Sequence, residues 1–521
     1  MQSGEKLSEA ASAARTVAAI DIGSNSLRMV IAEVLPDGHL EIQERLQRAV
    51  RLGQDTFRRG RLGAASMRAA VAILRDYRHL LELYKVERVR AVATSAVREA
   101  ANADNFLNRV FMATGLNIEV IATSEESRLT VSAVRQSVGD ALGVNQGESL
   151  IAEAGGGSTL LTVLDRGEIA GTQSLRLGSI RLQEMFSTAE EAPERSAELL
   201  RSHIANVISG VSGSLPLDKV TSFVAVGGDA RFAGREIGKP TDSPDLSIVL
   251  PADLDKLVRR CETLSAEKLA KHYGLPFTEA ETLVPALLVY QHLLHQTGAE
   301  RVIVSRVSLR DGLLMELARQ VRGEEDRALV EGVVHSATSI AEKYRVDVNH
   351  AQNVAEAALR LFDELQAEHG LLPRHRLLLR VAALLHEVGS FVSNAAHHKH
   401  SYYLIANSEI YGLNREDIET VAHVARYHRR SGPKPSHLEY IALPRESRVA
   451  VSKLAALLRV ADALSRGRGR PLPRLRFERR GDEFLILTPG AAELILERRA
   501  LAVKGDMFED IFGLRLRLEE G

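Results

Sequence analysis

Two stretches of the sequence repeat one spacing of residues that could bind phosphate. Asp21 is followed two residues later by glycine and five residues later by serine, and Glu153 is followed by the same residue types at the same distances. Glycine lets the backbone approach a ligand closely, and successive exposed N–H groups in such a turn attract an anion. An acid beside the turn would repel phosphate but would bind a divalent cation that neutralises it. The repeat therefore predicts two phosphate-binding turns, with Asp21 and Glu153 as metal ligands.

Each of these acids ends a short apolar run that is typical of a strand, residues 17–20 in the first case and 150–152 in the second. After each serine an apolar strand resumes and reaches a polar turn, Pro36–Gly38 or Asp165–Gly167. The agreement of acid, glycine, serine and downstream turn favours a duplicated unit over two unrelated hairpins. We therefore expect two related α/β lobes whose glycine turns face each other across one anionic chain.

Two further segments could complete such a site. Ser95 follows another apolar run, and Arg98 lies a helical turn later, where its guanidinium could bind phosphate through two hydrogen bonds. Glu125 and Glu126 stand at an expected helix start. Acids in the first turn of a helix already stabilise it, so their spacing alone leaves helix stabilisation and catalysis both open.

Composition limits the classes of partner and compartment. The chain has 521 residues, of which 45% are hydrophobic, enough for more than one domain. Its formal net charge of -1 gives no overall attraction to nucleic acid or membrane. The only cysteine, Cys261, excludes an intramolecular disulfide and suits a reducing compartment. No apolar run approaches the roughly 20 residues of a membrane span, and the first 15 residues have no apolar core. We expect a soluble, cytoplasmic protein without a transmembrane segment.

The character of the sequence changes along the chain. Apolar runs alternate with glycine turns and amphipathic stretches up to about residue 312, the region from about 324 to 466 has a helical pattern, and the tail is mixed. We expect a flexible N-terminus over residues 1–15, one α/β lobe over 16–135 and a second over 136–312. A helical domain over 313–470 and a small α+β domain over 471–521 would follow.

The ordered set of segments resembles the exopolyphosphatase and guanosine pentaphosphate phosphohydrolase (Ppx/GppA) family. The matching segments are residues 19–26, 94–98, 125–128, 155–159, 227–228 and 304–312, followed by 384–389, 397–401 and 426–429. The resemblance implies a duplicated actin-like, ribonuclease-H-type ATPase fold and a homodimer. It also implies Mg²⁺-dependent release of terminal phosphate from inorganic polyphosphate, or of one phosphate from guanosine pentaphosphate (pppGpp). Mn²⁺ is the alternative metal.

The same resemblance assigns roles by position. Glu126 would deprotonate the attacking water, with its neighbour Glu125 as the less favoured base, and Arg98 would bind the terminal phosphoryl group. The implied phosphate-binding residues are Gly23, Ser24, Asn25, Ser26, Arg28, Ser95, Gly155, Gly156, Gly157, Ser158 and Gly228. The family usually has Asp where this chain has Glu153, and Glu where it has Leu160. These departures put metal binding in doubt, although Asp229 could partly compensate.

The helical region is rich in histidine. Several of its residues follow the order of an HD-type metal phosphohydrolase, namely His350, His386, Glu387, His400, His428 and Asp462, but Glu387 replaces the aspartate of that family. We therefore expect an HD-like domain without chemistry of its own, with a working second metal site as the alternative. Its basic side chains could extend a groove for a long polyanion, with a merely solvated face as the alternative. The residues of this groove would be His398, His400, Arg426, His428 and Arg429.

These features favour an exopolyphosphatase, because extra C-terminal domains suit a long substrate. A pppGpp 5'-phosphohydrolase, using the same residues, is the first alternative. A protein that binds polyphosphate, pppGpp or ppGpp and turns it over weakly, because of Glu153 and Leu160, is the second.

Overall fold

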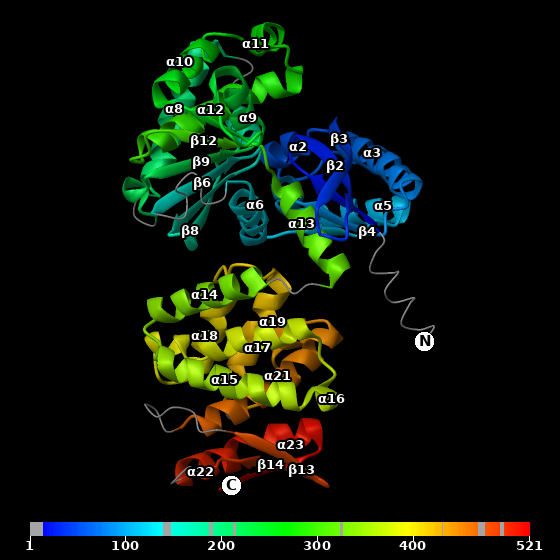
Figure 1. Ribbon diagram of the computed structural model, residues 1–521, viewed down its shortest axis with the longest axis vertical. Coiled ribbons are helices and arrows are strands. Elements are labelled where there is room, and N and C mark those ends of the chain that lie inside the picture. Colours follow the sequence, from blue (N-terminus) through cyan, green and yellow to red (C-terminus); the bar gives the residue numbers. More distant parts are fainter. Residues whose placement is uncertain are drawn as a thin grey trace. The chain divides into compact units, whose positions relative to one another are not determined.

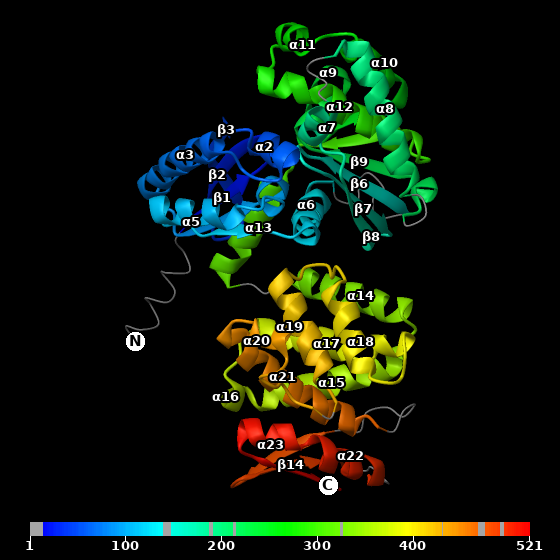
Figure 2. The same ribbon diagram turned by 180° about the vertical axis from the view of Figure 1, so that it is seen from behind.

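The structure is a computed structural model that describes residues 14–138, 147–186, 191–211, 215–323, 327–429, 431–466, 475–489 and 494–520. The chain divides into two compact units, one up to residue 326 and one from Arg327 onward (Figures 1 and 2). The expected flexible N-terminus lies outside the described residues, apart from its last two residues. Among the described residues, no helix is long and apolar enough to cross a membrane.

Unit 1 contains two mixed β-sheets. The first has the order β3-β2-β1-β4-β5, and the second has the order β10-β11-β12-β9-β6-β7-β8. The first sheet consists of β1 (Arg15–Ile22), β2 (Ser26–Val34), β3 (Leu40–Ala49), β4 (Arg88–Ala93) and β5 (Ile118–Val120). The second consists of β6 (Glu148–Ala154), β7 (Thr159–Asp165), β8 (Glu168–Leu175), β9 (Ser222–Val226), β10 (Lys239–Pro240), β11 (Leu246–Val249) and β12 (Val302–Ser305).

The two sheets share one topology over five strands. In the first, β2 is antiparallel to both β1 and β3, while β4 lies parallel to β1 and β5 parallel to β4. In the second, β7, β6, β8, β9 and β12 pair in the corresponding way. The central strands β1 and β6 are almost wholly buried, which explains their continuous apolar runs. The predicted duplication and the actin-like fold are confirmed.

Helices cover both sheets of unit 1 (Figure 1). They are α2 (Leu52–Arg59), α3 (Ala64–Leu83), α4 (Ser95–Arg98), α5 (Ala103–Thr114), α6 (Thr123–Val138), α7 (Ser179–Phe186), α8 (Pro193–Ser209), η2 (Leu217–Lys219), α9 (Gly228–Ile237), α10 (Pro251–Cys261), α11 (Ala266–Tyr273), α12 (Phe277–His295) and α13 (Leu309–Arg322). Helix α13 follows the second sheet in the sequence but packs on the first, where Leu313 and Leu317 join Val17 and Val30 in one core. The sequence prediction started the helical domain at residue 313, inside this helix.

Unit 2 is helical, with a small sheet near the end of the chain. Its helices are α14 (Arg327–Lys343), α15 (Val348–Glu364), α16 (Gln366–His369), α17 (Pro373–Leu385), η3 (Val388–Phe391), α18 (His397–Ala406), α19 (Arg415–Arg426), α20 (Leu438–Ile441), α21 (Arg445–Leu464), α22 (Ile495–Lys504) and α23 (Asp506–Phe512). The sheet has the order β13 (Arg476–Arg480), β14 (Glu483–Leu487) and β15 (Arg515–Glu519). One hydrophobic core runs from Val333 to Leu518, so the small sheet and the helices are packed together. The other predicted domain boundaries stay predictions.

Candidate active site

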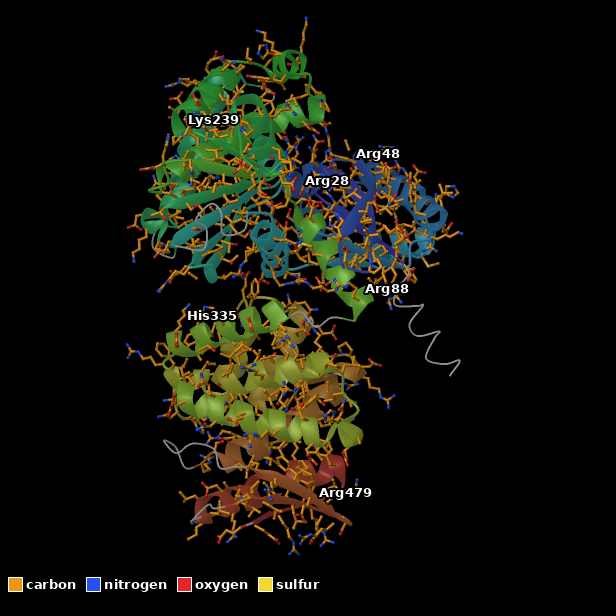
Figure 3. The ribbon with its side chains drawn as sticks, viewed as in Figure 1. Arg28, Arg48, Arg88, Lys239, His335 and Arg479 are labelled. Carbon is orange, nitrogen blue, oxygen red and sulfur yellow. The ribbon has the colours of Figure 1, made fainter. Side chains whose placement is uncertain are left out.

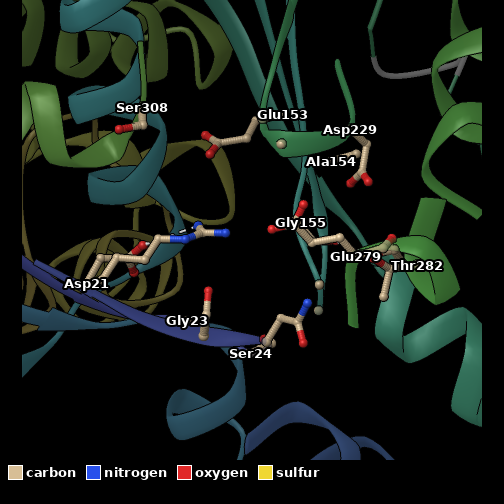
Figure 4. Close-up of a pocket in the computed structure, with 18 of the residues that line it drawn as sticks. Asp21, Gly23, Ser24, Glu153, Ala154, Gly155, Asp229, Glu279, Thr282 and Ser308 are labelled. Atoms are coloured by element: carbon tan, nitrogen blue, oxygen red, sulfur yellow. Dashed lines mark hydrogen bonds and ion pairs between the residues drawn. The ribbon is translucent and has the colours of Figure 1, made fainter. Parts of the chain in front are cut away.

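A polar pocket of about 320 Å³ opens in unit 1 where the two glycine turns meet (Figure 4). Its lining includes every residue that the sequence nominated for phosphate binding except Arg98, together with both nominated metal ligands and Glu126. In Figure 4, Asp21 and Gly23 come from the first lobe, while Glu153, Gly155 and Asp229 come from the second. Residues that are distant in the sequence therefore converge on one site, as facing turns require.

The two turns have the same internal geometry. The Gly23 N–H donates to the Ser26 carbonyl at 3.1 Å, and the Gly155 N–H donates to the Ser158 carbonyl at 2.9 Å. The hydroxyl oxygens of Ser24 and Ser95 lie 3.0 Å apart. A Cβ added to Gly157 would lie 2.3 Å from the Ser95 Oγ, so only glycine allows the second turn to approach so closely. Ser95 is thus the point where the two turns meet.

Arg181 hydrogen-bonds to the second glycine turn, a role that the sequence did not reveal. Its Nε donates to the Gly157 carbonyl at 2.6 Å, its Nη2 donates to a carboxylate oxygen of Glu99 at 2.5 Å, and its guanidinium lies 4.1 Å from the ring centre of Phe57. The side chain is buried. Its neighbours come from three separate segments, so no local pattern could have revealed this role.

Glu126 lies in the first turn of α6 and faces the pocket. Burial raises the pKa of its carboxyl to about 7 against the opposing effect of Arg98, and the nearby Glu153 carboxylate raises it further. Arg98 Nη1 lies 3.2 Å from the Glu126 Oε2 and also donates to the Ile121 carbonyl at 2.8 Å. A carboxyl with a pKa near the working pH suits proton transfer.

Two nominated residues lie outside the pocket lining, although both are described. Arg98 supports Glu126 by the ion pair just given, and its role as a direct phosphate ligand stays a prediction. Glu125 points to another side of α6, where its two oxygens accept from Arg128 at 2.7 Å each and from Arg90 at 3.0 Å. Burial raises the pKa of Glu125, but these two arginines together hold it below the usual range.

The acids of the pocket form a set of oxygen donors. The Asp21 Oδ2 lies 3.4 Å from Arg310 and 3.8 Å from Arg28, which is labelled in Figure 3. The Glu153 Oε2 accepts a hydrogen bond from Thr130 at 2.7 Å, and burial raises the pKa of this acid. Burial also raises the pKa of Asp229 to about 7. Carboxylates whose charge is disfavoured in this way fit a hard divalent cation such as Mg²⁺ or Mn²⁺.

The pocket also holds cations that the sequence reasoning did not assign. Arg231 lines it beside Arg28, and burial together with Arg28 lowers the pKa of Arg231. The Arg231 Nη1 is buried and has no hydrogen-bond partner among the described residues. Arg310 belongs to the segment 304–312 that carried the family resemblance, but it was given no role there. A bound anion could accept a hydrogen bond from the Arg231 Nη1.

The predicted polyanion groove of unit 2 is only partly assembled. His428 and Arg429 line a pocket of about 670 Å³ within that unit, whereas His398, His400 and Arg426 lie outside its lining. Arg426 lies over the ring of Tyr402 at 5.1 Å and pairs with Glu439 at 3.5 Å. The groove stays a prediction.

An actin-like fold with a pocket lined by two glycine turns between its lobes defines the class of protein. The sequence matches the Ppx/GppA phosphatase family over residues 14–321 and domain III of that family over residues 334–484. The chain belongs to the Ppx/GppA phosphatase family and is a hydrolase acting on phosphoric anhydrides.

Several known proteins are similar to the chain. The guanosine-5'-triphosphate,3'-diphosphate pyrophosphatase of Photobacterium profundum is 23% identical, over 85% of this chain and 84% of its own length. The protein of the same name from Aeromonas hydrophila is 26% identical, over 91% and 92%. Among solved structures, an exopolyphosphatase from Cytophaga hutchinsonii covers 60% of this chain and 99% of its own, with a TM-score of 0.53 and 22% identity. The last similarity bears on the fold alone.

Proposed function

We propose that the chain removes the terminal 5'-phosphate of pppGpp. The observation that carries this proposal is the composition of the pocket beyond the glycine turns. Its wall continues into Phe232, Leu275 and Leu283, with Arg235 beside them. An apolar wall next to a phosphate cradle suits a nucleoside polyphosphate, because inorganic polyphosphate has no apolar part to place there. The names of the curated relatives support the same choice. Exopolyphosphatase, favoured by the sequence, thereby becomes the second candidate.

Phe232 is only 4% exposed, so it adds a small apolar contact to the pocket wall. Its ring packs edge-on against Tyr273, with the ring centres 5.0 Å apart, and the Arg235 guanidinium lies 5.3 Å from its centre. Burial of further apolar surface by a base against this wall would contribute about 25 cal/mol per Å². Arg28 and Arg231 supply positive charge in the pocket lining, and Arg310 pairs with Asp21 at 3.4 Å. A guanosine bearing phosphates at both ends would use all of these groups.

The reaction follows from the placement of Glu126. Its carboxylate accepts a proton from the attacking water, while Arg98 fixes the carboxylate in place. The N–H groups of the two glycine turns and the arginines stabilise the charge that develops on the transferred phosphoryl group. Mg²⁺ or Mn²⁺ held by Asp21, Glu153 and Asp229 would neutralise phosphate charge when bound. The third candidate function is a weakly active binding protein. It rests on Glu153 and on Leu160, which is buried and pairs with Glu153 on the neighbouring strand.

Competition between the two substrates tests the proposal. Phosphate release from pppGpp and from long-chain polyphosphate would be measured with Mg²⁺ and with Mn²⁺ for the native chain and for Phe232→Leu. We expect Phe232→Leu to raise KM for pppGpp by roughly 2–10-fold, as the loss of apolar contact with the base would cause, and to leave polyphosphate hydrolysis unchanged. Phe186→Leu, a replacement at a ring that pairs with His203 outside this pocket, should change neither reaction.

Each outcome separates the candidate functions. Rapid release from polyphosphate with no hydrolysis of pppGpp would refute the proposal and establish the exopolyphosphatase. Slow turnover of both, with a large gain in the Glu153→Asp, Leu160→Glu double variant, would establish the weakly active binding protein. We also propose that the enzyme works as a homodimer in the cytoplasm. The family resemblance supports the homodimer, and the single, buried cysteine fits a reducing compartment.

A further inference from the structure

Histidines and acids also gather in unit 2, outside the phosphate pocket. His350 lies on α15, His386 and Glu387 follow directly after α17, and Asp462 lies on α21. One possible ligand atom from each of His350, His386 and Glu387 lies within 4.8 Å of the other two. The Asp462 Oδ1 lies 3.9 Å from the His350 Nε2. Two imidazoles and two carboxylates at such distances form a ligand set for a divalent transition metal.

The orientation of the His386 ring supports this interpretation. The His386 Nδ1 lies 2.7 Å from the Ala383 carbonyl oxygen. A carbonyl oxygen only accepts, so Nδ1 must carry the proton. In the neutral ring the lone pair is then on the other nitrogen, Nε2. Metal-binding histidines are commonly fixed by such backbone hydrogen bonds.

A lysine approaches the same group from the end of the chain. Lys504 is the last residue of α22, and its Nζ contacts the Asp462 Oδ2, the second oxygen of the carboxylate that faces His350. Lys504 and Asp462 are only 7% and 4% exposed. Burial, together with Arg459 and Arg429, lowers the pKa of Lys504 to about 7, and Glu387 opposes this shift. Lys504 and Glu387 both line the pocket of unit 2. A buried carboxylate needs a cation, and here Lys504 supplies one.

We propose that the Lys504 ammonium is the resident cation of a transition-metal site formed by His350, His386, Glu387 and Asp462. With the lysine in place, the native chain binds no metal there. Removal of the lysine charge makes the site bind a divalent ion such as Co²⁺ or Zn²⁺. All of these residues lie in unit 2, so the inference is independent of the function proposed for unit 1.

Co²⁺ is a suitable probe, because nitrogen and oxygen ligands of the protein give it characteristic visible absorption. The full-length native chain and the variants Lys504→Met and Lys504→Gln would be titrated with Co²⁺, and bound metal would be counted after dialysis. We expect about one tightly bound Co²⁺ per chain in each variant, with raised thermal stability, and none at this site in the native chain.

Two control variants make the test specific. Lys453→Met also removes a hydrogen-bonded lysine of unit 2. The Lys453 Nζ donates to the His369 carbonyl at 2.6 Å, but both ring nitrogens of His369 already have backbone partners. This variant should gain no metal. Adding His386→Ala to Lys504→Met should abolish the gain.

Three results would overturn the proposal. They are a Lys504→Met variant that gains no Co²⁺, a native chain that binds it equally well, and binding that survives the loss of His386. If both Lys504 variants fail to fold alone, they would be refolded with and without Co²⁺. Folding only with the metal would support the proposal, and failure in both conditions would count against it.

Discussion

Glu125 and Glu126 are neighbours in the first turn of α6, yet their surroundings shift the pKa values of their carboxyls in opposite directions. The pKa of Glu126 is raised to about 7, whereas Arg128 and Arg90 hold the pKa of Glu125 below the usual range. Successive residues of a helix point about 100° apart, so one side chain enters the pocket while the other enters an ion-pair network. The two acids therefore have separable roles, which substitution can distinguish.

Glu126→Gln should lower kcat by about 10²–10⁴-fold and leave the fold intact, because the amide cannot accept the proton of the attacking water. Phosphate release from pppGpp and urea unfolding would be measured together. An unchanged kcat would show that another group is the base.

Glu125→Gln provides the contrast at the adjacent position. It leaves the buried Arg128 with Glu316 as its remaining carboxylate partner, so the cost stays below the roughly 3–5 kcal/mol of a buried charge that loses its only partner. We expect a clear drop in the free energy of unfolding, while the folded fraction keeps kcat near the native value. A large loss of kcat without loss of stability would instead make Glu125 a catalytic group.

The raised pKa values of Glu126 and Asp229 predict how stability depends on pH in the absence of metal. Both carboxyls titrate near 7 in the folded chain but near 4.5 and 3.8 without the fold. Between these values the folded chain binds protons that the unfolded chain has released, so the free energy of unfolding falls as the pH rises toward 7. Urea unfolding in a chelator between pH of about 4 and 8 would measure this slope.

Matched variants test whether Glu126 and Asp229 cause this dependence of the free energy of unfolding on pH. Glu126→Gln combined with Asp229→Asn should flatten it, and Mg²⁺ should restore stability of the native chain above pH of about 7, since the cation binds the ionised carboxylates. A slope that is unchanged in the double variant would place its origin elsewhere.

The spacing of residues along the sequence predicted most residues that line the pocket, but not the side chains that hold them in place. Both glycine turns could be recognised because the acid, glycine and serine of each turn lie within six residues of the chain. Arg181 and Arg231 act through groups far away in the sequence, so their roles depend on tertiary approach. The family resemblance singled out Arg98 as a site residue, but it did not predict the contact of Arg98 with Glu126, which only the structure shows.

At the scale of the elements, the central strands were predictable and the edge strands were not. The apolar runs 17–20, 89–93, 150–152, 223–226 and 302–304 all lie in central strands of the two sheets. Such strands are buried on both faces, so they leave a continuous apolar signal. The edge strand β3 is half exposed and rich in charge, and its sequence gives no such run.

The junction of α7 with the second glycine turn gives a prediction at this scale. A Cβ on Gly178 would lie 2.2 Å from the carbonyl carbon of Gly157, so Gly178→Ala must displace the turn. We expect kcat/KM to fall roughly 100-fold, as misplacement of a catalytic group by about 1 Å can cause, and stability to fall by about 1–3 kcal/mol. Steady-state kinetics and thermal unfolding would measure both.

Gly210 serves as the matched control. It ends α8 with a φ of -67°, and the nearest atom to an added Cβ would be the Val207 carbonyl oxygen at 3.4 Å. Gly210→Ala should therefore leave kcat/KM unchanged and stability equal or slightly higher. A similar loss of activity in both variants would argue against displacement of the turn as the cause.

At the scale of the whole molecule, each unit has hydrophobic cores of its own. One core lies entirely within unit 2, and the other four lie entirely within unit 1. Every residue that lines the phosphate pocket also belongs to unit 1. The chemistry proposed above thus requires no side chain beyond residue 310, whereas the predicted polyanion groove requires unit 2.

This division predicts that a fragment of residues 1–323 folds and hydrolyses pppGpp. Its kcat/KM should stay within about tenfold of the full chain, or about 1.4 kcal/mol of transition-state stabilisation. If unit 2 extends a polyanion groove, the fragment should lose affinity for long polyphosphate more than for tripolyphosphate, because only the long chain reaches beyond the pocket. Equal losses of affinity for long polyphosphate and tripolyphosphate would show that unit 2 forms no such groove. A folded fragment that cleaves none of the three substrates would show that unit 2 contributes to the active site itself.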